Sequence, residues 1–199
     1  SLEIGLCVWQ IDSQLIQLDE VERSLRTPSP SRILDVRHAM LIGMNDERIH
    51  SLSNIDYWFL SKLRNILRLE ELYLKGKDIN DIDSNALFTL KQYGFSDKQI
   101  STALGTNESV IRDMRDSLNI RPVYKTVDTC AGEFSSDTPY HYSTYERPFK
   151  RQMADGTIQE LEPGDEVRES LKKKIIILGG GPNRIGQGIE FDYCCCHAS

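Results

Sequence analysis

The feature that most constrains the fold is an uninterrupted apolar run, Ile175–Leu178, followed directly by a glycine-rich segment. A strand without polar alternation is typical of a parallel sheet covered on both faces. Such a strand needs parallel partners, and each parallel connection takes roughly a dozen residues or more. Only residues 189–199 follow the glycines. We therefore expect the partner strands to lie outside this sequence and the chain to be a piece of a larger protein.

The composition is that of a folded protein, because 39% of the 199 residues are hydrophobic and 27% are charged. The formal net charge of −6 provides no basic surface, so we predict neither nucleic acid nor membrane as a partner. Three of the five cysteines are consecutive, Cys194–Cys196, which suits disulfides poorly and predicts a reducing, cytoplasmic location. No apolar stretch approaches the roughly 20 residues that span a bilayer.

Residues 27–119 are predicted to form a compact all-helical unit. The first helix has Ser29 as its N-cap and Pro30 at its first position. The second helix follows Asn45 or Asp46 as its cap. The clearest helix is capped by Asp56 and carries leucines at helical spacing, and Ser96 with Gln99 fits a capping box at a later helix. Residues 1–25 show no clear pattern. The expected helices are Pro30–Met40, Glu47–Leu52, residues 57 to about 74, Ser84–Tyr93, Asp97–Leu104 and Glu108–Leu118.

After the helices the sequence turns to β-branched and aromatic residues. Residues 121–145 are predicted to be an extended segment that lies across other surfaces. The polar stretch that follows carries turn signals at Asp155-Gly156 and Pro163-Gly164. We therefore divide the chain into a helical domain with its extended segment (1–146), a linker or surface loop (147–173) and the start of an α/β domain (174–199).

The helices predicted at Asp97–Leu104 and Glu108–Leu118 have the general form of a helix-turn-helix. A recognition helix that faces phosphates is expected to be basic. In residues 96–119, however, the three bases are outnumbered by four acids: Lys98, Arg112 and Arg115 against Asp97, Glu108, Asp113 and Asp116. Plain helical packing is therefore favoured over nucleic-acid binding.

The glycine loop fits neither usual nucleotide template. The dinucleotide pattern that starts at Gly179 has Arg184 where its third glycine belongs. In the phosphate-loop pattern, Gln187 and Gly188 replace the lysine and the hydroxyl residue. Two interpretations stay open: the bare N–H groups hold an anion, or the glycines only permit tight turns. The candidate residues of this loop are Gly180, Gly181, Asn183, Arg184 and Gly186.

No catalytic or metal-binding residue is predicted. Side chains of successive helical residues point about 100° apart, so Cys194–His197 cannot converge on one ion. Buried packing of these small residues is the better interpretation. Glu190 and Asp192 are acids near the start of a helix, where they are favoured without any catalytic role.

Several runs of residues resemble the large subunit of carbamoyl-phosphate synthetase, and the glycine run is long enough to be a specific match. These runs are Gly94–Ile100, Ile120–Ala131, Tyr142–Tyr145 and Leu178–Cys195. The resemblance covers nearly the whole chain. It implies a mainly α fold: the family's helical oligomerisation domain, then an extended segment, then from Lys174 the first strand, loop and helix of an incomplete α/β (pre-ATP-grasp) domain.

The resemblance also implies a function. The family is an ATP-dependent ligase whose two homologous halves use two ATP to make carbamoyl phosphate from bicarbonate and ammonia or glutamine, for pyrimidine or arginine biosynthesis. Its ATP and Mg sites would lie outside these residues, so we expect this fragment to bind no cofactor and to be inactive alone. The expected partners are other domains of the same subunit, further copies in a homo-oligomer, and a glutaminase subunit or domain.

In this family, reactive intermediates pass between the halves through a tunnel, and the resemblance places Gly188–Glu190 in its wall. A bare backbone at Gly188 would leave room for an intermediate, and Glu190 would face carbamate or a proton in transit. The stretch 147–173 looks longer than the usual bacterial connection, and Cys196 stands where a branched aliphatic residue is common.

One alternative is a free-standing helical interaction module, including a nucleic-acid-binding helix-turn-helix. Such a module is not expected to end in an unpaired apolar strand, because exposed strand edges invite aggregation. The ligase fragment is therefore the favoured interpretation.

Overall fold

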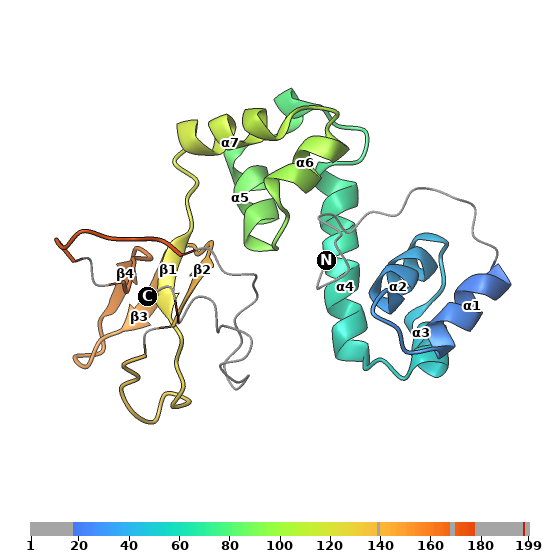
Figure 1. Cartoon of the computed structure of the whole chain (residues 1–199), viewed down its shortest axis with the longest axis horizontal. Coiled ribbons are helices and arrows are strands. Elements are labelled where there is room, and N and C mark those ends of the chain that lie inside the picture. Colours follow the sequence, from blue (N-terminus) through green and yellow to red (C-terminus); the bar gives the residue numbers. More distant parts are fainter. Residues whose placement is uncertain (1–17, 139, 168–169, 178–196, 198–199) are drawn as a thin grey trace. The chain divides into compact units, whose positions relative to one another are not determined.

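The computed structural model describes residues 18–138, 140–167, 170–177 and 197 (Figure 1). The chain forms two units, residues 1–166 and 167–199. The helices and strands named below all belong to the first unit, in which helices dominate and the strands form two small antiparallel sheets. The predicted mainly α fold is confirmed in this form.

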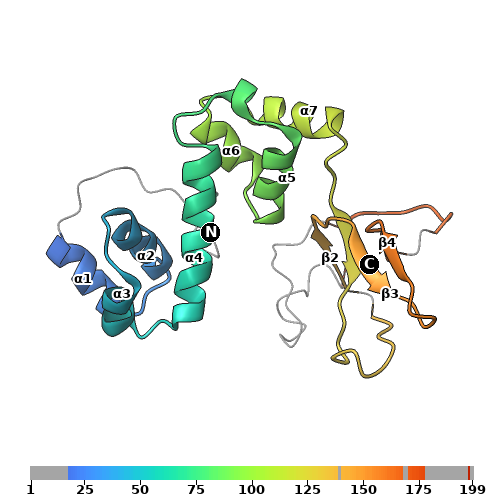
Figure 2. The same ribbon diagram turned by 180° about the vertical axis from the view of Figure 1, so that it is seen from behind.

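The first four helices enclose one apolar core, and we call this part the first lobe. It consists of α1 (Leu18–Arg26), α2 (Arg32–Leu41), α3 (Asp46–Ser53) and the N-terminal half of α4 (Tyr57–Tyr73), as Figure 2 shows from behind. The side chains buried in this core are Val21, Leu25, Val36, Ala39, Met40, Ile49, Leu52 and Leu60.

The following elements enclose a second core, and we call this part the second lobe. It consists of the end of α4, the short 3-10 helix η1 (Ile79–Asp81), α5 (Ser84–Gln92), α6 (Asp97–Ala103) and α7 (Glu108–Ser117). The side chains buried in it are Leu74, Ile82, Ala86, Leu87, Leu90, Phe95, Ile100, Leu104, Ile111 and Ile120.

Helix α4 contributes to both cores. Leu60, near its N-terminus, is fully buried in the first lobe, and Leu63 and Leu67 pack beside it on the same helical face. Ile66 and Leu69 pack against the second core. One helix of 17 residues therefore joins two separate apolar clusters.

Most of the predicted helix caps are confirmed. Asp56 accepts a hydrogen bond from the N–H of Trp58, and Ser96 accepts one from the N–H of Gln99. Asn45 caps α3 in the same way. These side chains satisfy N–H groups that the first helical turn leaves without partners.

The start of α2 and the presence of α1 differ from the prediction. Ser29 and Pro30 do not begin α2; a separate turn precedes the helix, which starts at Arg32 with Ser31 as its N-cap. Helix α1 was not predicted. Its three apolar residues, Leu18, Val21 and Leu25, are spaced as on one helical face, so the pattern is present but extends over only nine residues.

The predicted extended segment is confirmed in part: two strands near its ends form an antiparallel pair, and the described residues between them form a loop with turns. Strand β1 (Val123–Thr126) pairs with β2 (His141–Thr144), with Val123 opposite Thr144. The sequence prediction of a linker or loop at 147–173 missed a second hairpin, formed by β3 (Phe149–Gln152) and β4 (Ile158–Leu161). Its strands have only four residues each and carry mixed polar and apolar side chains, so they lack the alternation that marks a half-buried strand.

The apolar run near the C-terminus does not form a paired strand in the part of the chain that the structure describes. Ile175 and Ile176 are 90% and 84% exposed. A fully apolar strand needs neighbours on both edges and covered faces, and the described residues do not supply them. The predicted α/β domain from residue 174, and the domain boundaries at 146 and 173, stay predictions.

Because the two cores are separate, a cavity in one is expected to loosen mainly that lobe. We predict that Leu60→Ala lowers the free energy of unfolding by about 3 kcal/mol, since truncating a buried leucine leaves a cavity. Amide hydrogen exchange should rise in α2 and α3 more than in α6 and α7. The matched control is Leu87→Ala in the second core, for which the pattern should reverse; equal acceleration of both lobes by either variant would contradict two separate cores.

Candidate functional site

The residues predicted for the glycine loop and the tunnel all lie outside the described residues. They are Gly180, Gly181, Asn183, Arg184, Gly186, Gly188 and Glu190. Their roles stay predictions. The described structure instead brings together a different set of charged and aromatic side chains, at the place where the helical unit meets the chain that follows it.

The centre of this set is the carboxylate of Asp97, which is only 11% exposed. Lys91 donates to its Oδ1 at 2.8 Å, and Arg115 donates to both carboxylate oxygens at 2.7 to 3.0 Å. We call these three residues the Asp97 hub. Each comes from a different helix of the second lobe, so the hub ties α5, α6 and α7 together.

The hub also fixes the loops next to these helices. Lys91 donates to the carbonyl of Phe95 at 2.8 Å, before α6 begins. Arg115 donates to the carbonyl of Ile120 at 3.3 Å, where the chain leaves α7 for β1. Lys91 and Arg115 therefore bind both the Asp97 side chain and the backbone of the loops that flank α6 and α7.

The electrostatics of the hub favour its charged form. Burial alone would raise the pKa of Asp97, but the hydrogen bonds from Arg115 and Lys91 outweigh it and hold that pKa below its ordinary value. The hydrogen bonds that Arg115 donates to Asp97 raise the pKa of Arg115. Since the carboxylate is ionised and paired with two cations, the hub is suited to holding structure and not to proton transfer.

The chain that follows the helices returns to the hub at Tyr145. The ammonium group of Lys91 lies 5.5 Å from the centre of the Tyr145 ring, and Phe88 meets that ring edge-on at 6.4 Å. Burial of the phenol raises the pKa of Tyr145. Two residues further on, Arg147 donates to Asn85 and Thr89 and lies over the ring of Phe88. These contacts dock the chain beyond β2 onto α5.

We call residues 121–166, the chain that follows the helices, the extension. A second set of contacts holds its C-terminal end, residues 165 and 166, against β1. Asp165 and Glu166 accept hydrogen bonds from the N–H groups of Tyr124 and Thr126 at 2.7 and 2.9 Å, and Glu166 donates its own N–H to the Tyr124 carbonyl. The hydrogen bond from Thr126 lowers the pKa of Glu166. Residues 165–166 thus occupy an edge of β1 that would otherwise offer bare backbone groups.

Sequence reasoning missed the Asp97 hub, because Asp97 and Arg115 were counted only as charges. The available signal was position: Lys91 lies in the last turn of α5, Asp97 is the first residue of α6, and Arg115 lies in the last turn of α7. Ends of short helices joined by tight turns meet in space, so opposite charges at such ends are candidates for pairing.

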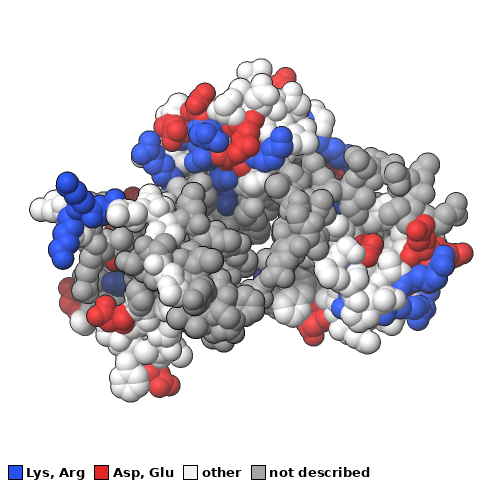
Figure 3. All heavy atoms as spheres, viewed as in Figure 1, with Lys and Arg blue, Asp and Glu red and all other residues white. Residues whose placement is uncertain are grey.

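The paired helices α6 and α7 present no basic surface in the part that the structure describes. Arg115 is held in the hub, and Arg112 and Arg121 face Glu108 and Asp116 at 3.7 and 3.5 Å. Figure 3 shows basic and acidic side chains interspersed over this region. The arrangement gives no support to nucleic-acid recognition.

A groove of about 510 Å³ lies where the two lobes meet. Its charged rim is internally compensated: Glu70 pairs with Arg37 at 2.6 Å, Glu71 with Lys75 at 3.1 Å, and Arg64 with Asp46 at 2.6 Å. Among the described residues, no group of three or more His, Cys, Asp or Glu side chains could hold a metal ion. No described helix is both long enough and apolar enough to cross a membrane.

The hub yields a prediction about pH. Asp97→Asn should lower the free energy of unfolding of the 199-residue chain by about 3 kcal/mol at pH 7, because two half-buried cations lose their counter-charge. The folded pKa of Asp97 lies below the unfolded value of about 3.9, so the stability it confers is present above that pH and is lost as the pH falls through the folded pKa. The difference between wild type and variant should therefore shrink below about pH 4.

Urea unfolding at several pH values checks this prediction. Asp113→Asn, which removes an exposed carboxylate from α7, is the matched control and should change stability little at any pH. An Asp97→Asn deficit that stays constant from pH 7 to pH 3 would show that the charge of Asp97 does not stabilise the fold.

Comparison with known proteins gives two family matches along the chain. The family described as the oligomerisation domain of the carbamoyl-phosphate synthetase large chain matches residues 1–119. The preATP-grasp domain of carbamoyl phosphate synthase matches residues 171–199. The hub and α5 belong to the first match, and the glycine loop belongs to the second.

Individual relatives match the whole chain. Carbamoyl phosphate synthase large chains of Nostoc sp. and Synechocystis sp. are 45% and 47% identical to it over 201 and 202 residues. The arginine-specific, chloroplastic large chain of Arabidopsis thaliana is 44% identical over 202 residues. In each case all of this chain is covered, but it spans only 16% to 17% of the relative's length. With the matches to the oligomerisation and preATP-grasp domains, this similarity shows that the chain belongs to the carbamoyl-phosphate synthetase large-chain family.

Proposed function

We propose that this chain is the middle segment of an ATP-dependent ligase that makes carbamoyl phosphate from bicarbonate, ammonia or glutamine, and two ATP. The observation that carries the proposal is the order of the two family matches, with the oligomerisation domain at 1–119 before the start of a preATP-grasp domain at 171–199. A segment with this order fits between two synthetase halves. The product would enter pyrimidine or arginine biosynthesis in the cytoplasm.

Within that ligase, the helical unit would mediate contacts between large chains. The first lobe exposes several apolar side chains around the end of α2, including Leu18, Leu41 and Ile42, which are 55%, 57% and 46% exposed. Apolar side chains at a surface favour association with another protein surface. Other domains of the same chain and a glutaminase subunit or domain are the further partners that this proposal implies.

The proposal places the ATP and Mg sites in the rest of the polypeptide. Magnesium in ATP-dependent enzymes is held by carboxylates together with substrate phosphates. The buried carboxylate of Asp97 is paired with Lys91 and Arg115, which supports a structural role for it. In the proposal, the described residues connect and position other parts of the ligase.

The glycine segment would form part of the passage for intermediates. Gly188 would leave the passage open, and Glu190 would interact with carbamate or a proton in transit. The loop of Gly180, Gly181, Asn183, Arg184 and Gly186 would hold an anion or permit tight turns. This role rests on the family resemblance of the run Leu178–Cys195 and on the preATP-grasp match.

The function is tested with the longer chain that contains these residues. It should form carbamoyl phosphate from bicarbonate and ammonia with two ATP consumed per product. The 199-residue chain is the control and should show no such activity. A longer chain that consumes no ATP in the presence of both substrates would contradict the proposal.

The passage is tested by a bulky side chain at Gly188. In the longer chain, Gly188→Phe should raise the ATP consumed per carbamoyl phosphate severalfold, because a blocked intermediate is lost to hydrolysis while ATP turnover continues. Gly164→Phe is the matched control, since a Cβ at Gly164 meets no atom within 4 Å. Unchanged stoichiometry in the Gly188 variant would exclude Gly188 from the passage wall.

A further inference from the structure

Helix α4 begins with three aromatic residues that its own lobe leaves uncovered. Tyr57, Trp58 and Phe59 are 47%, 60% and 57% exposed. Tyr57 is stacked on His50 at 4.4 Å, whereas Trp58 contacts Phe59 edge-on and has the ammonium of Lys62 5.1 Å from its ring centre. Trp58 and Phe59 thus form an exposed aromatic pair next to a cation. Such a pair in a protein surface is typical of a contact site.

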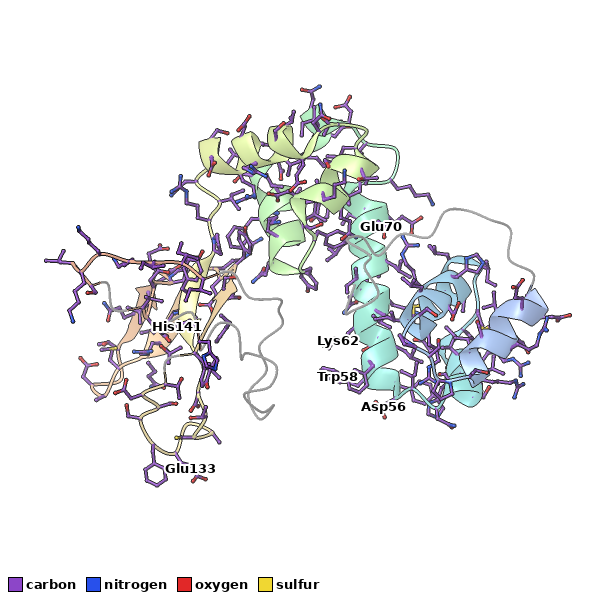
Figure 4. The ribbon with its side chains drawn as sticks, viewed as in Figure 1. Asp56, Trp58, Lys62, Glu70, Glu133 and His141 are labelled. Carbon is purple, nitrogen blue, oxygen red and sulfur yellow. The ribbon has the colours of Figure 1, made fainter. Side chains whose placement is uncertain are left out.

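The exposed aromatic pair begins a continuous stripe along α4. With about 100° between successive residues, Trp58 and Lys62 lie on the face opposite the buried Leu60. Figure 4 shows both projecting from the side of α4 that faces away from α2 and α3. Residues at spacings of three and four share one face. We call this set the α4 stripe: Trp58, Lys62, Asn65 and Leu72; Leu69, on the same face, is partly buried against the second core.

The C-terminal part of the stripe borders a groove. The groove has a volume of about 590 Å³ and is lined by Asn65, Arg68, Leu69, Glu71, Leu72 and Tyr93. Leu72 and Tyr93 are 61% and 49% exposed. Tyr93, the C-cap residue that follows α5, therefore extends the apolar surface from α4 to the end of α5.

This surface is continuous with an interface that the chain already uses. Asn85, Thr89 and Tyr93 are spaced four residues apart and lie on one face of α5. Asn85 and Thr89 on that face hold Arg147, from the chain beyond β2. The same polypeptide thus packs on the α5 face one helical turn away from the groove. Further chain would reach the α4 stripe by extending that interface.

We propose that the α4 stripe is the docking surface for a further domain of the same polypeptide. This inference rests on the proposed function, in which the chain is the middle of a longer protein. Its relatives carry 83% of their length outside the matched part, because the match covers 17%. A tethered domain faces the stripe at an effective concentration of roughly millimolar, so it covers an apolar surface without strong affinity of its own.

The test compares the accessibility of Trp58 in two proteins. Hydroxyl-radical footprinting, calibrated with a dosimeter, measures the oxidation rate of Trp58 in the 199-residue chain and in the longer large chain, each over a tenfold or greater range of concentration. We expect a severalfold lower rate in the longer chain at every concentration. Equal rates in the two proteins would overturn the proposal.

If the stripe is covered by something other than a further domain, the footprint differs in a recognisable way, and each such result overturns the proposal. Protection that grows with concentration in either protein means that a second copy covers the stripe. Protection already present in the dilute 199-residue chain means that residues of this chain cover it. Carbamoyl phosphate synthesis, measured on the same sample of the longer chain, distinguishes failure of the docking proposal from failure of the proposed function. An active enzyme in which Trp58 is exposed rejects the docking surface alone. An inactive chain rejects the proposed function, whatever the oxidation rate of Trp58.

A pair of variants adds a second readout. Trp58→Lys in the longer chain should accelerate hydrogen exchange along α4 severalfold, because the tethered domain no longer packs on it, whereas in the 199-residue chain it should change exchange little. Phe134→Lys, which alters a side chain 75% exposed and far along the sequence in the extension, is the matched control and should leave α4 unchanged in both. An identical effect of Trp58→Lys in both proteins would mean that Trp58 serves only the helical unit.

Discussion

The pairing of Asp97 with two cations is the interaction on which the connection between the helical unit and the following chain depends. A carboxylate that is 11% exposed is costly to ionise alone, and it is stable here because Lys91 and Arg115 reach it from two other helices. The same two cations bind backbone carbonyls at both neighbouring loops. Lys91 also lies over Tyr145, so the place where the chain returns from the β1–β2 hairpin is set by the same group of charges.

The two-core arrangement gives this connection a rigid base. Each lobe buries a small cluster of side chains, and α4 belongs to both. The bidentate contact of Arg37 with Glu70 adds a polar tie between α2 and α4. In a large chain, such a unit would fix the positions of neighbouring domains. The Asp97 hub would hold the extension, and the α4 stripe, on the face of α4 opposite Leu60, would hold a further domain.

Sequence reasoning predicted those features that depend on local signals. The caps at Asp56 and Ser96 and the leucine face of α4 could be predicted because capping and helical periodicity act within a few residues. The β3–β4 hairpin could not, since its strands have four residues each and no regular alternation. Helix α1 was missed although Leu18, Val21 and Leu25 are at helical spacing, because that pattern extends over only nine residues. The Asp97 hub has a local signal, opposite charges at the ends of short helices, but its pairing with Arg115 spans 18 residues, so its geometry comes only from the folded arrangement. The contact of Lys91 with Tyr145 spans a still longer stretch of sequence.

The Asp97 hub and the chain beyond β2 form one joint, in which Asp97 is connected to Arg147 through Lys91, Tyr145 and Phe88. A double-mutant cycle with Asp97→Asn and Arg147→Ala, measured by urea unfolding at pH 7, tests this coupling. We expect an interaction free energy of about 1 kcal/mol, because residues in one network are not additive. Additivity within about 0.3 kcal/mol would contradict it, since that result is typical of independent sites.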